Sequence, residues 1–485
     1  MKTKLHSFIL CLVIGMMPLL GFSQVQIGDD IDGEASGDIS GESISISSDG
    51  TRVVIGAYGN DGNGSASGHA RVYEYINSIW TQLGEDINGL EAFSYFGFSV
   101  DISLDGNTIV IGTKINNINA SQNFYVGVYK FINNDWIQLG ANITNDNSNG
   151  SGDSVSINSD GSIVAIGTRS ISNNKGHVRV FQYVNDNWLQ IGTNILGEDS
   201  GDSSGYSISL NSVGDIVAIG APYNNENGEH SGHVRIYQYI NNHWSQLGSD
   251  IDGITFSEGF GKSVSINSQG NIVAIGALSR NNESLVNAGC VTVYENINDE
   301  WIQIGNIIYG VSSSENLGRS VSLSPDASVI ATGGNDILKI FNNINGEWIQ
   351  VGVDLHGEQS DDRFGVSVGN SLNGNIVAVG ANYNDGNGES SGQVRVYDLS
   401  EVLSVNEYSL LELKIYPNPT INTLHIEANN ILTSVEIYNL LGQQILSSKP
   451  NTLIEEINMS EFDSGMYLVK VTIDEQEATY KVLKQ

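Results

Sequence analysis

The chain of 485 residues carries 55 acidic and 21 basic side chains, which give a formal net charge of −34 at pH 7. Such a charge disfavours nucleic acid and anionic membranes as partners and favours cations or basic partners, although it also serves simply to keep an exported protein soluble. Only two cysteines are present, Cys11 and Cys290, so the hydrophobic core rather than a disulfide framework must hold a fold of this length.

Residues 1–23 have the pattern of a secretory signal peptide. Lys2 and Lys4 precede an apolar run from Phe8 to Leu20, and small residues follow before Gln24. The run is too short for a membrane anchor, and no later apolar stretch approaches the roughly 18 to 20 residues that span a bilayer. Removal of the signal leaves a single cysteine. We therefore expect an exported protein without a transmembrane segment or an intramolecular disulfide.

Between residues 24 and 400 one motif recurs six times, an aromatic residue followed seven positions later by tryptophan. Asn, Asp and Gly lie between the two, and these residues tolerate the positive φ of a tight hairpin. The motif returns every 47 to 57 residues, a period typical of propeller blades or solenoid repeats. The pairs are Tyr73/Trp80, Tyr129/Trp136, Phe181/Trp188, Tyr237/Trp244, Tyr294/Trp301 and Phe341/Trp348.

Each repeat contains four short strand patterns and no helical pattern. The first strand alternates apolar with small polar residues, the second is a continuous apolar run, the third alternates again, and the fourth begins at the tryptophan. Four antiparallel strands in about 50 residues predict the blade of a β-propeller. A β-solenoid is the structural alternative, but its repeats are usually shorter and lack two tight hairpins per unit.

The first-strand pattern occurs seven times, whereas the tryptophan occurs only six times. The seventh unit ends after Tyr397 without a tryptophan, but residues 25–33 near the N-terminus copy the end of other units, such as 247–253. We therefore predict that the N-terminal strand completes the last blade. This pairing closes a seven-bladed ring and leaves no exposed edge strand.

The order of the strands assigns the loops to two faces of the ring. The first and third turns of each blade are tight and share one face. The second turn and the crossover to the next blade are longer, carry acids and share the other face. Three of the second turns match in length, at 57–68, 221–232 and 381–392. We expect binding at this second face, because variable loops commonly carry function.

The second turns also contain candidate calcium ligands: Asp61, Glu226, Asp385 and Glu389. Calcium accepts carboxylate and carbonyl oxygens in flexible loops, and no other cofactor is expected. The spacing matches no complete EF-hand loop, however, and Asn, Asp and Gly are equally common as ordinary turn formers.

Three histidines occupy one repeated position before the third strand, His69, His177 and His233, where other units have Cys290 or Gln393. Rotation from blade to blade spreads these side chains around the ring. We therefore expect a structural role for them rather than a shared zinc site.

No catalytic triad, Cys/His pair or phosphate-cradling glycine loop stands out from the repeats. Acidic side chains are plentiful, so a glycosidase-like carboxylate pair stays open, but no pair can be named. Arg319 and Arg363 depart from the repeat near the first strands of units six and seven, and we expect them to pair with neighbouring acids.

Phe-Gly opens a unit at 96–97, 260–261 and 364–365, and Gly-Ala-Pro follows a second strand at 220–222. In these motifs residues 25–400 resemble the FG-GAP repeats of integrin α-type propellers. Calcium-binding members of that family carry Asp-x-Asp-x-Asp-Gly between the first two strands. This chain has only Ser-Asp-Gly or similar there, so it does not match the family's metal position.

After an expected linker at 401–412, residues 413–485 read as a small β-sandwich of alternating strands. Pro417, Asn418 and Pro419 mark its entry turn, and Gly465 and Tyr467 open a late strand. The segment resembles the type A C-terminal sorting domain of the bacterial type IX secretion system. The resemblance implies a Bacteroidetes-type bacterium, contact with that secretion machinery and passage across the outer membrane. Removal of the tail, with release or attachment to the cell surface, would follow.

The sequence thus predicts an all-β protein, a seven-bladed propeller at 24–400 followed by a β-sandwich. The predicted function is non-enzymatic binding of an extracellular protein or glycan through the acidic loop face, in adhesion or scaffolding. The alternative is a secreted hydrolase or lyase that acts on polysaccharide.

Overall fold

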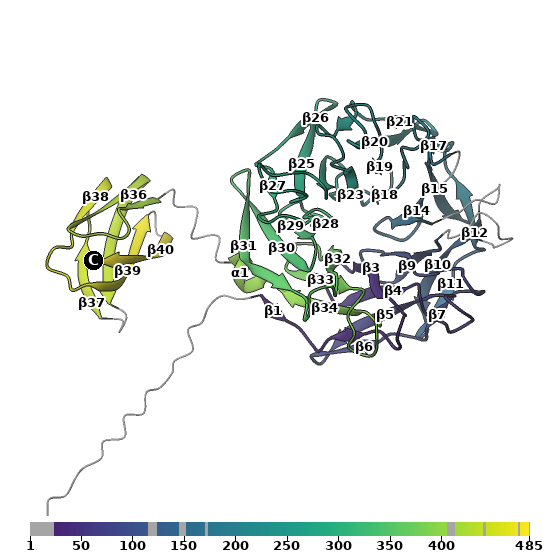
Figure 1. Cartoon of the computed structure of the whole chain (residues 1–485), viewed down its shortest axis with the longest axis horizontal. Coiled ribbons are helices and arrows are strands. Elements are labelled where there is room, and N and C mark those ends of the chain that lie inside the picture. Colours follow the sequence, from purple (N-terminus) through teal and green to yellow (C-terminus); the bar gives the residue numbers. More distant parts are fainter. Residues whose placement is uncertain are drawn as a thin grey trace, which may run out of the picture.

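The computed structural model describes residues 24–114, 124–144, 152–169, 173–404, 413–439, 443–473 and 476–484, and the predicted signal peptide lies outside them. The described part of the chain from residue 24 to 398 forms seven antiparallel sheets arranged around a ring (Figure 1). This arrangement confirms the predicted seven-bladed propeller.

The first strand of every blade lines the central axis. Its serines are small enough for this crowded position, and six of them donate a hydrogen bond to a glycine carbonyl of the next blade. Ser263 Oγ lies 2.9 Å from Gly318 O, and Ser367 Oγ joins the last blade to the first through Gly41 O at 2.7 Å. The first strands are β3 (Ser40–Ile46), β8 (Ser99–Ile102), β13 (Ser154–Ile157), β18 (Ser207–Leu210), β23 (Phe260–Ile266), β28 (Ser320–Leu323) and β32 (Phe364–Asn370).

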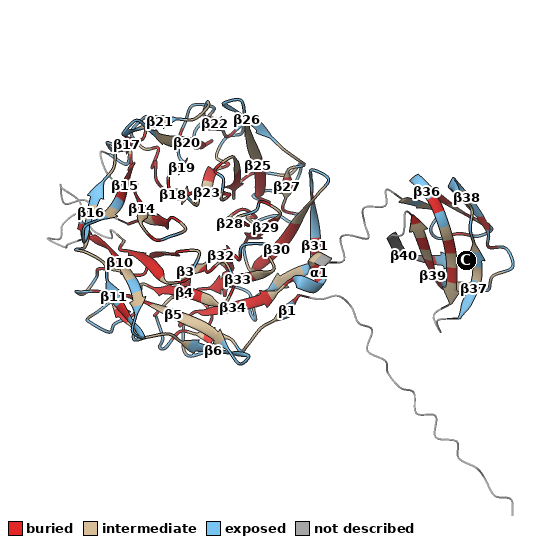
Figure 2. Ribbon diagram, turned by 180° about the vertical axis from the view of Figure 1, so that it is seen from behind, coloured by how far each residue is buried: buried red, intermediate tan, exposed pale blue. Residues whose placement is uncertain are grey.

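The second strands are apolar along almost their whole length because both of their faces pack against neighbouring blades. One cluster joins Ile236 of one blade to Val264 and Ile275 of the next. Figure 2 accordingly shows burial concentrated in the inner strands, with exposed residues toward the rim. The second strands are β4 (Arg52–Ala57), β9 (Thr108–Gly112), β14 (Ile163–Thr168), β19 (Ile216–Ala221), β24 (Ile272–Ala277), β29 (Val329–Gly333) and β33 (Ile376–Ala381).

The third and fourth strands form the tight outer hairpins that the sequence predicts. The third strands are β5 (His69–Ile76), β10 (Tyr125–Ile132), β15 (His177–Val184), β20 (His233–Ile240), β25 (Cys290–Ile297), β30 (Ile337–Ile344) and β34 (Gln393–Asp398). The fourth strands are β6 (Ile79–Gln82), β11 (Asp135–Gln138), β16 (Asn187–Gln190), β21 (His243–Gln246), β26 (Glu300–Gln303), β31 (Glu347–His356) and β1 (Val25–Gln26).

Short segments after the fourth strands return to pair with the third strands of their blades. They are β7 (Ile87–Asn88), β12 (Ile143–Thr144), β17 (Ile195–Leu196), β22 (Ile251–Asp252), β27 (Ile308–Tyr309) and β2 (Ile31–Asp32). In the sixth blade the long strand β31 covers both parts.

The repeated tryptophan links adjacent blades as well as two strands of one blade. Trp136 Nε1 donates to Leu83 O of the preceding blade at 2.8 Å, and a Cβ atom added at Gly84 would lie 2.8 Å from the indole. Trp80, Trp188 and Trp244 make the same kind of bond. The Gln-Leu-Gly pattern therefore ends in glycine because the next blade's indole packs against it.

The N-terminal strand closes the ring as predicted. Val25 pairs with Asp398 of β34, so β1 supplies the outer strand of the seventh blade. Gln24 holds the repeat position that tryptophan has elsewhere, and its amide bonds both backbone groups of Val353 at 2.8 and 3.1 Å. The short helix α1 (Ser400–Ser404) follows, with Val402 buried against the core of this blade.

Isolated parallel bridges join the end of one blade's second turn to the crossover that opens the next blade. Gly68 bridges Phe96, and Gly232 bridges Phe260. At the other end of the axis the tight turns bond to one another through backbone groups, for example Ser212 N to Ser268 O at 3.1 Å. The two loop classes thus occupy the two faces to which the strand order assigned them.

The C-terminal residues form a separate small β domain. Its 17-residue strand β36 (Thr423–Asn439) is shared by two groups of strands, because its first half pairs with β35 (Leu413–Tyr416) and β38 (Thr452–Asn458). Its second half pairs with β37 (Gln444–Ser448) and β39 (Gly465–Ile473), and β40 (Gln476–Lys484) extends the latter. A buried apolar cluster fills the domain.

Candidate ligand-binding funnel

A cavity of about 560 Å³ opens at the axis, on the face that carries the second turns and the crossovers. Its volume lies within the roughly 300 to 1,000 Å³ of typical ligand sites. Every blade contributes the residue that follows the glycine at the start of its first strand. These seven residues, here called the axial ring, are Glu42, Phe98, Asp153, Tyr206, Lys262, Arg319 and Val366.

The residues on either side of each axial-ring residue are the same in every blade, whereas the axial-ring residue itself varies. In every blade the ring residue lies between a glycine and a serine. Gly261 has a φ of +84°, and an added Cβ there would lie 2.7 Å from His233 O, so only glycine fits before Lys262. The backbone is thereby fixed at each position, while the side chain that lines the cavity varies from blade to blade.

A second tier lies at the ends of the second strands. Arg169, Leu278 and Asn335 line the cavity from this tier, and Lys114 occupies the equivalent position in the second blade. Lys114 Nζ lies 4.3 Å from the ring centroid of Phe98, a residue of the axial ring. Cations from two levels thus converge on one opening.

Five cationic side chains gather at this mouth, against two carboxylates. The cations are Lys114, Arg169, Lys262, Arg319 and Arg363, and the carboxylates are Glu42 and Asp153. Burial lowers the pKa of Lys114 and, with the neighbouring Arg363 charge, that of Arg319. The mouth therefore concentrates positive charge in a strongly acidic protein, which favours an anionic ligand.

The two carboxylates leave most of these cations without a close counter-charge. Asp153 forms an ion pair with Arg169 at 3.5 Å, and Glu42 accepts a hydrogen bond from Asn382 Nδ2 at 2.5 Å. Burial raises the pKa of both carboxyl groups. Among the described residues, Lys262 forms no ion pair within 4.0 Å.

Tyr206 lies between two of the cations. Lys262 Nζ contacts its hydroxyl and lies 4.0 Å from its ring centroid, and the Arg169 guanidinium lies 4.9 Å from the same centroid. Burial opposes ionisation of the phenol, but the two positive charges outweigh it and lower the pKa of Tyr206. The hydroxyl of Tyr206 therefore loses its proton more readily than that of an ordinary tyrosine.

Aromatic rings surround the charged centre. Tyr58 packs edge-on against Phe98 at 5.4 Å, and Tyr223 packs against Tyr206 at 6.1 Å between centroids. The Arg363 guanidinium lies 3.9 Å from the Tyr383 centroid. Flat apolar faces next to cations suit a ligand with both sugar-like faces and anionic groups.

Arg319 and Arg363 do not have the partners that the sequence suggested. In the described part of the chain neither forms an ion pair within 4.0 Å, and Arg319 instead contacts Asn335 Oδ1 at 3.3 Å. The prediction that they pair with neighbouring acids was wrong. They belong to the cationic mouth because blades six and seven bring them close to the axis. The sequence does not predict that these two arginines lie close to the other cations.

The candidate calcium ligands lie in three separate loops. Asp61 and Asp385 accept hydrogen bonds from the backbone of their own turns, at 2.7 Å from Ala66 N and 2.7 Å from Ser390 N. Glu389 lies in the same turn as Asp385. Glu226 instead lies near His233 and two further carboxylates.

The three histidines start the third strands of three different blades and are buried. Burial, followed by the charge of a nearby arginine, lowers the pKa of His177 and of His233 to about 4. Each imidazole is therefore neutral at pH 7. His69 and His233 each lie beside carboxylates, and each does so in its own cluster.

The sorting-motif residues gather at one end of the C-terminal domain although they are far apart in sequence. Asn418 Oδ1 accepts a hydrogen bond from Leu483 N at 2.9 Å, and Gly465 pairs with Lys484. The side chain of Tyr467 is buried, and its hydroxyl donates to Asp463 O at 2.9 Å. Pro417 and Pro419 flank Asn418 in the same turn.

The axial ring is the feature that inspection of the sequence missed. The seven first strands are predictable from their pattern, but the variable residue after the glycine of each strand shows only when the repeats are compared at that position. A position that varies between glutamate, lysine, arginine and aromatics inside a constant Gly-x-Ser frame is the signal that would have found it.

Two protein families match parts of the chain. Residues 414–485 match the secretion system C-terminal sorting domain, and residues 31–73 match the FG-GAP repeat. Within the described residues, no helix has the length and apolar character needed to cross a membrane.

A curated relative shares a limited segment with this chain. An ulvan lyase of Nonlabens ulvanivorans, NLR42, is 34% identical over 103 residues, which cover 20% of this chain and 19% of the relative. The chain thus matches about a fifth of the length of that relative.

Two solved structures overlap most of the chain at low similarity. A functionally unknown protein from Desulfotomaculum acetoxidans is 16% identical, with a TM-score of 0.44 over 68% of this chain and 90% of that one. The Kuenenia stuttgartiensis hydrazine synthase is 10% identical, with a TM-score of 0.47 over 73% and 94%. The family matches together with the seven sheets show a β-propeller that matches the FG-GAP repeat at residues 31–73, followed by a type IX C-terminal sorting domain, which indicates export to the cell surface or the medium.

Proposed function

We propose that the exported propeller binds an acidic polysaccharide in the axial funnel, through the carboxylate or sulfate groups of the glycan. The observation that carries the proposal is a cavity lined by three cations in a chain of net charge −34, with two more cations close to its Glu42. The lining cations are Arg169, Lys262 and Arg319, and the two nearby cations are Lys114 and Arg363. Cations in a partly dehydrated site gain more from an anionic ligand than exposed cations do.

The surrounding chemistry favours a glycan over a small inorganic anion. Tyr58 and Phe98 offer flat faces beside Lys114, and Tyr223 does so beside Tyr206. Alternating apolar faces and charges match a chain of acidic sugars. The acidic loops around the mouth would then repel the rest of the polyanion and leave short segments to enter the funnel.

Gel retardation of the full mature chain in a panel of acidic and neutral polysaccharides tests this proposal. We expect retardation by acidic glycans only, weakening as salt concentration rises. Arg319→Gln should reduce it, whereas Lys130→Gln, an equal charge change at an exposed site on β10, should not. Retardation by neutral glycans alone, or by none of the panel, would contradict the proposal.

Tyr206 supports a second candidate function, cleavage of the bound glycan by β-elimination. A phenolate at Tyr206 would take the proton α to a uronate carboxylate, and Arg169 or Lys262 would stabilise the negative charge that develops. The electron pair forms a C=C bond, the glycosidic C–O bond breaks, and the leaving oxygen takes up a proton. The similarity to a protein named ulvan lyase supports this candidate, although it covers only a fifth of that protein.

Ultraviolet absorbance of the unsaturated product measures this cleavage directly. If the candidate is right, Tyr206→Phe should lower the rate by at least about 100-fold while retaining glycan binding. Binding without any rise in absorbance, or full activity of the Tyr206→Phe variant, would exclude the lyase and leave the binding proposal standing.

A further inference from the structure

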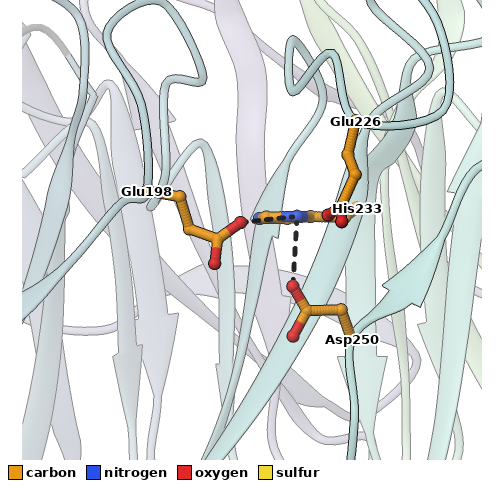
Figure 3. Close-up of side chains that lie close together, drawn as sticks. All are labelled: Glu198, Glu226, His233 and Asp250. Atoms are coloured by element: carbon orange, nitrogen blue, oxygen red, sulfur yellow. Dashed lines mark ion pairs between the residues drawn. The ribbon is translucent and has the colours of Figure 1, made fainter.

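Away from the funnel, four potential metal ligands meet beside the fourth blade. Glu198 comes from the crossover that enters the blade, Glu226 from its second turn, His233 from the start of β20, and Asp250 from the segment before β22. One ligand atom from each lies within 4.8 Å of all the others. Figure 3 shows the imidazole between the carboxylates, with the four side chains directed toward one another.

The buried imidazole has no hydrogen-bond partner where it meets these acids. The His233 side chain is 1% exposed, and Nδ1 makes no hydrogen bond in the described structure. Nδ1 lies 3.6 Å from Asp250 Oδ2 and 3.8 Å from Glu198 Oε2. These separations are too long for good hydrogen bonds. They are close to the edges of about 3.4 Å expected when atoms bind one metal ion at about 2.1 Å in a tetrahedron.

Nearby cations also balance the carboxylates of the cluster only in part. Arg235 contacts Glu198 Oε1 at 3.2 Å and Leu196 O at 3.1 Å. Glu198, Glu226 and Asp250 bring three carboxylates together on this side of the blade, where they repel one another. A bound cation would offset that repulsion.

The first blade shows the same position with both of its acids bound by an arginine, although His69 Nδ1 also makes no hydrogen bond there. There His69 lies beside Asp86 and Glu34, but Arg71 binds both oxygens of Asp86, at 2.7 and 2.8 Å, and also contacts Glu34. In the fourth blade Arg235 occupies the position of Arg71 in the repeat, yet it forms no ion pair with Asp250 among the described residues. The guanidinium that binds both acids of the first blade thus contacts Glu198 but not Asp250 in the fourth.

We propose that Glu198, Glu226, His233 and Asp250 bind a divalent transition-metal ion, of which Zn²⁺ is the best match. One imidazole nitrogen with carboxylate oxygens is a donor set that suits zinc, whereas calcium prefers an all-oxygen shell. The ion joins the crossover to the second turn of the same blade. That turn also carries Tyr223, which packs against Tyr206 in the funnel, so the metal holds one wall of the funnel in place.

Competition between the full mature chain, stripped of metal by a chelator, and a chromogenic zinc indicator tests the site. We expect one high-affinity Zn²⁺ per chain, and a loss of at least about tenfold in affinity in Glu226→Gln and in Asp250→Asn. Glu34→Gln is the matched control from the first blade and should bind zinc as the unchanged protein does. Circular dichroism verifies that each variant is folded.

X-ray absorption at the zinc edge provides a second readout that does not depend on variants. The proposal predicts one nitrogen and several oxygen ligands. Absence of zinc binding, binding of calcium in place of zinc, or zinc affinity unchanged in both Glu226→Gln and Asp250→Asn would overturn it.

Discussion

The two ends of the propeller axis are built from the same repeats but differ in which atoms they present. At the tight-turn end, backbone groups of successive turns bond to one another, as from Ser159 N to Ser212 O at 3.1 Å. At the funnel end, each blade instead presents one variable side chain. Backbone bonds need no particular side chain, whereas a ligand site does. The difference indicates that one end maintains the ring and the other carries specificity.

The division predicts that scaffold residues affect stability and funnel residues affect binding. The largest effect is expected for Trp136→Ala on the scaffold, because the change removes a buried indole and its bond to Leu83 O. The free energy of unfolding should fall by about 3 to 5 kcal/mol. Chemical denaturation measures it. Loss of glycan affinity in the folded fraction would argue against the division.

At the funnel, the double variant Lys262→Glu/Arg319→Glu should show the reverse pattern. Two charged contacts worth at least about 1.5 kcal/mol each correspond to a loss of more than about 100-fold in affinity for an acidic glycan. The free energy of unfolding should change by less than about 1 kcal/mol, because neither residue forms an ion pair within 4.0 Å among the described residues. Lys130→Glu at an exposed site on β10 is the control for a single charge reversal away from the funnel.

A buried histidine on the funnel side makes stability depend on pH. Burial, aided by Arg179, lowers the pKa of His177 from about 6.5 in the unfolded chain to about 4 in the fold. Its contribution is therefore complete above pH 6.5 and is lost as the pH falls from 6.5 to 4, by about 3 kcal/mol. His177→Gln should flatten the pH dependence of the unfolding free energy in that window. An unchanged slope would show that other groups dominate it.

The smallest effect is expected for Ser263→Ala, one residue from Lys262. The change removes the hydrogen bond to Gly318 O and should cost about 1 kcal/mol of stability. Glycan affinity should stay unchanged, because the serine bonds to the next blade rather than facing the ligand. If glycan affinity falls as strongly as in the Lys262→Glu/Arg319→Glu variant, Ser263 belongs to the binding site, and the division between scaffold residues and axial-ring residues is wrong.

The repeated sequence pattern predicted much of the fold because it reflects packing between residues that are close in sequence. Trp136 and the residues around it imply a hairpin, and the copy of a blade end at residues 25–33 implies ring closure; β1 pairs with β34 as expected. The assignment of loops to faces followed from strand order alone. These features depend on period and turn chemistry, which one sequence displays directly.

The chemistry of the site was harder to predict because it depends on which blades face one another across the axis. Overall charge pointed to a cationic or basic ligand, but the mouth itself collects Lys262, Arg319 and three further cations. Likewise, the sequence singled out Glu226 and His233 separately, while their approach to Glu198 and Asp250 arises from a crossover and a short edge strand. The spacing of residues within one repeat predicts neither the grouping of the cations at the mouth nor that of the four potential metal ligands.

Isothermal titration with a matched pair of ligands tests the central claim most directly. The full mature chain would be titrated with the acidic oligosaccharide that it binds best, and with the same oligosaccharide after carboxyl reduction or desulfation. The axial funnel predicts saturable binding of the acidic form at one site per chain and a loss of at least about 100-fold for the neutral form. Equal affinity for both forms would contradict it.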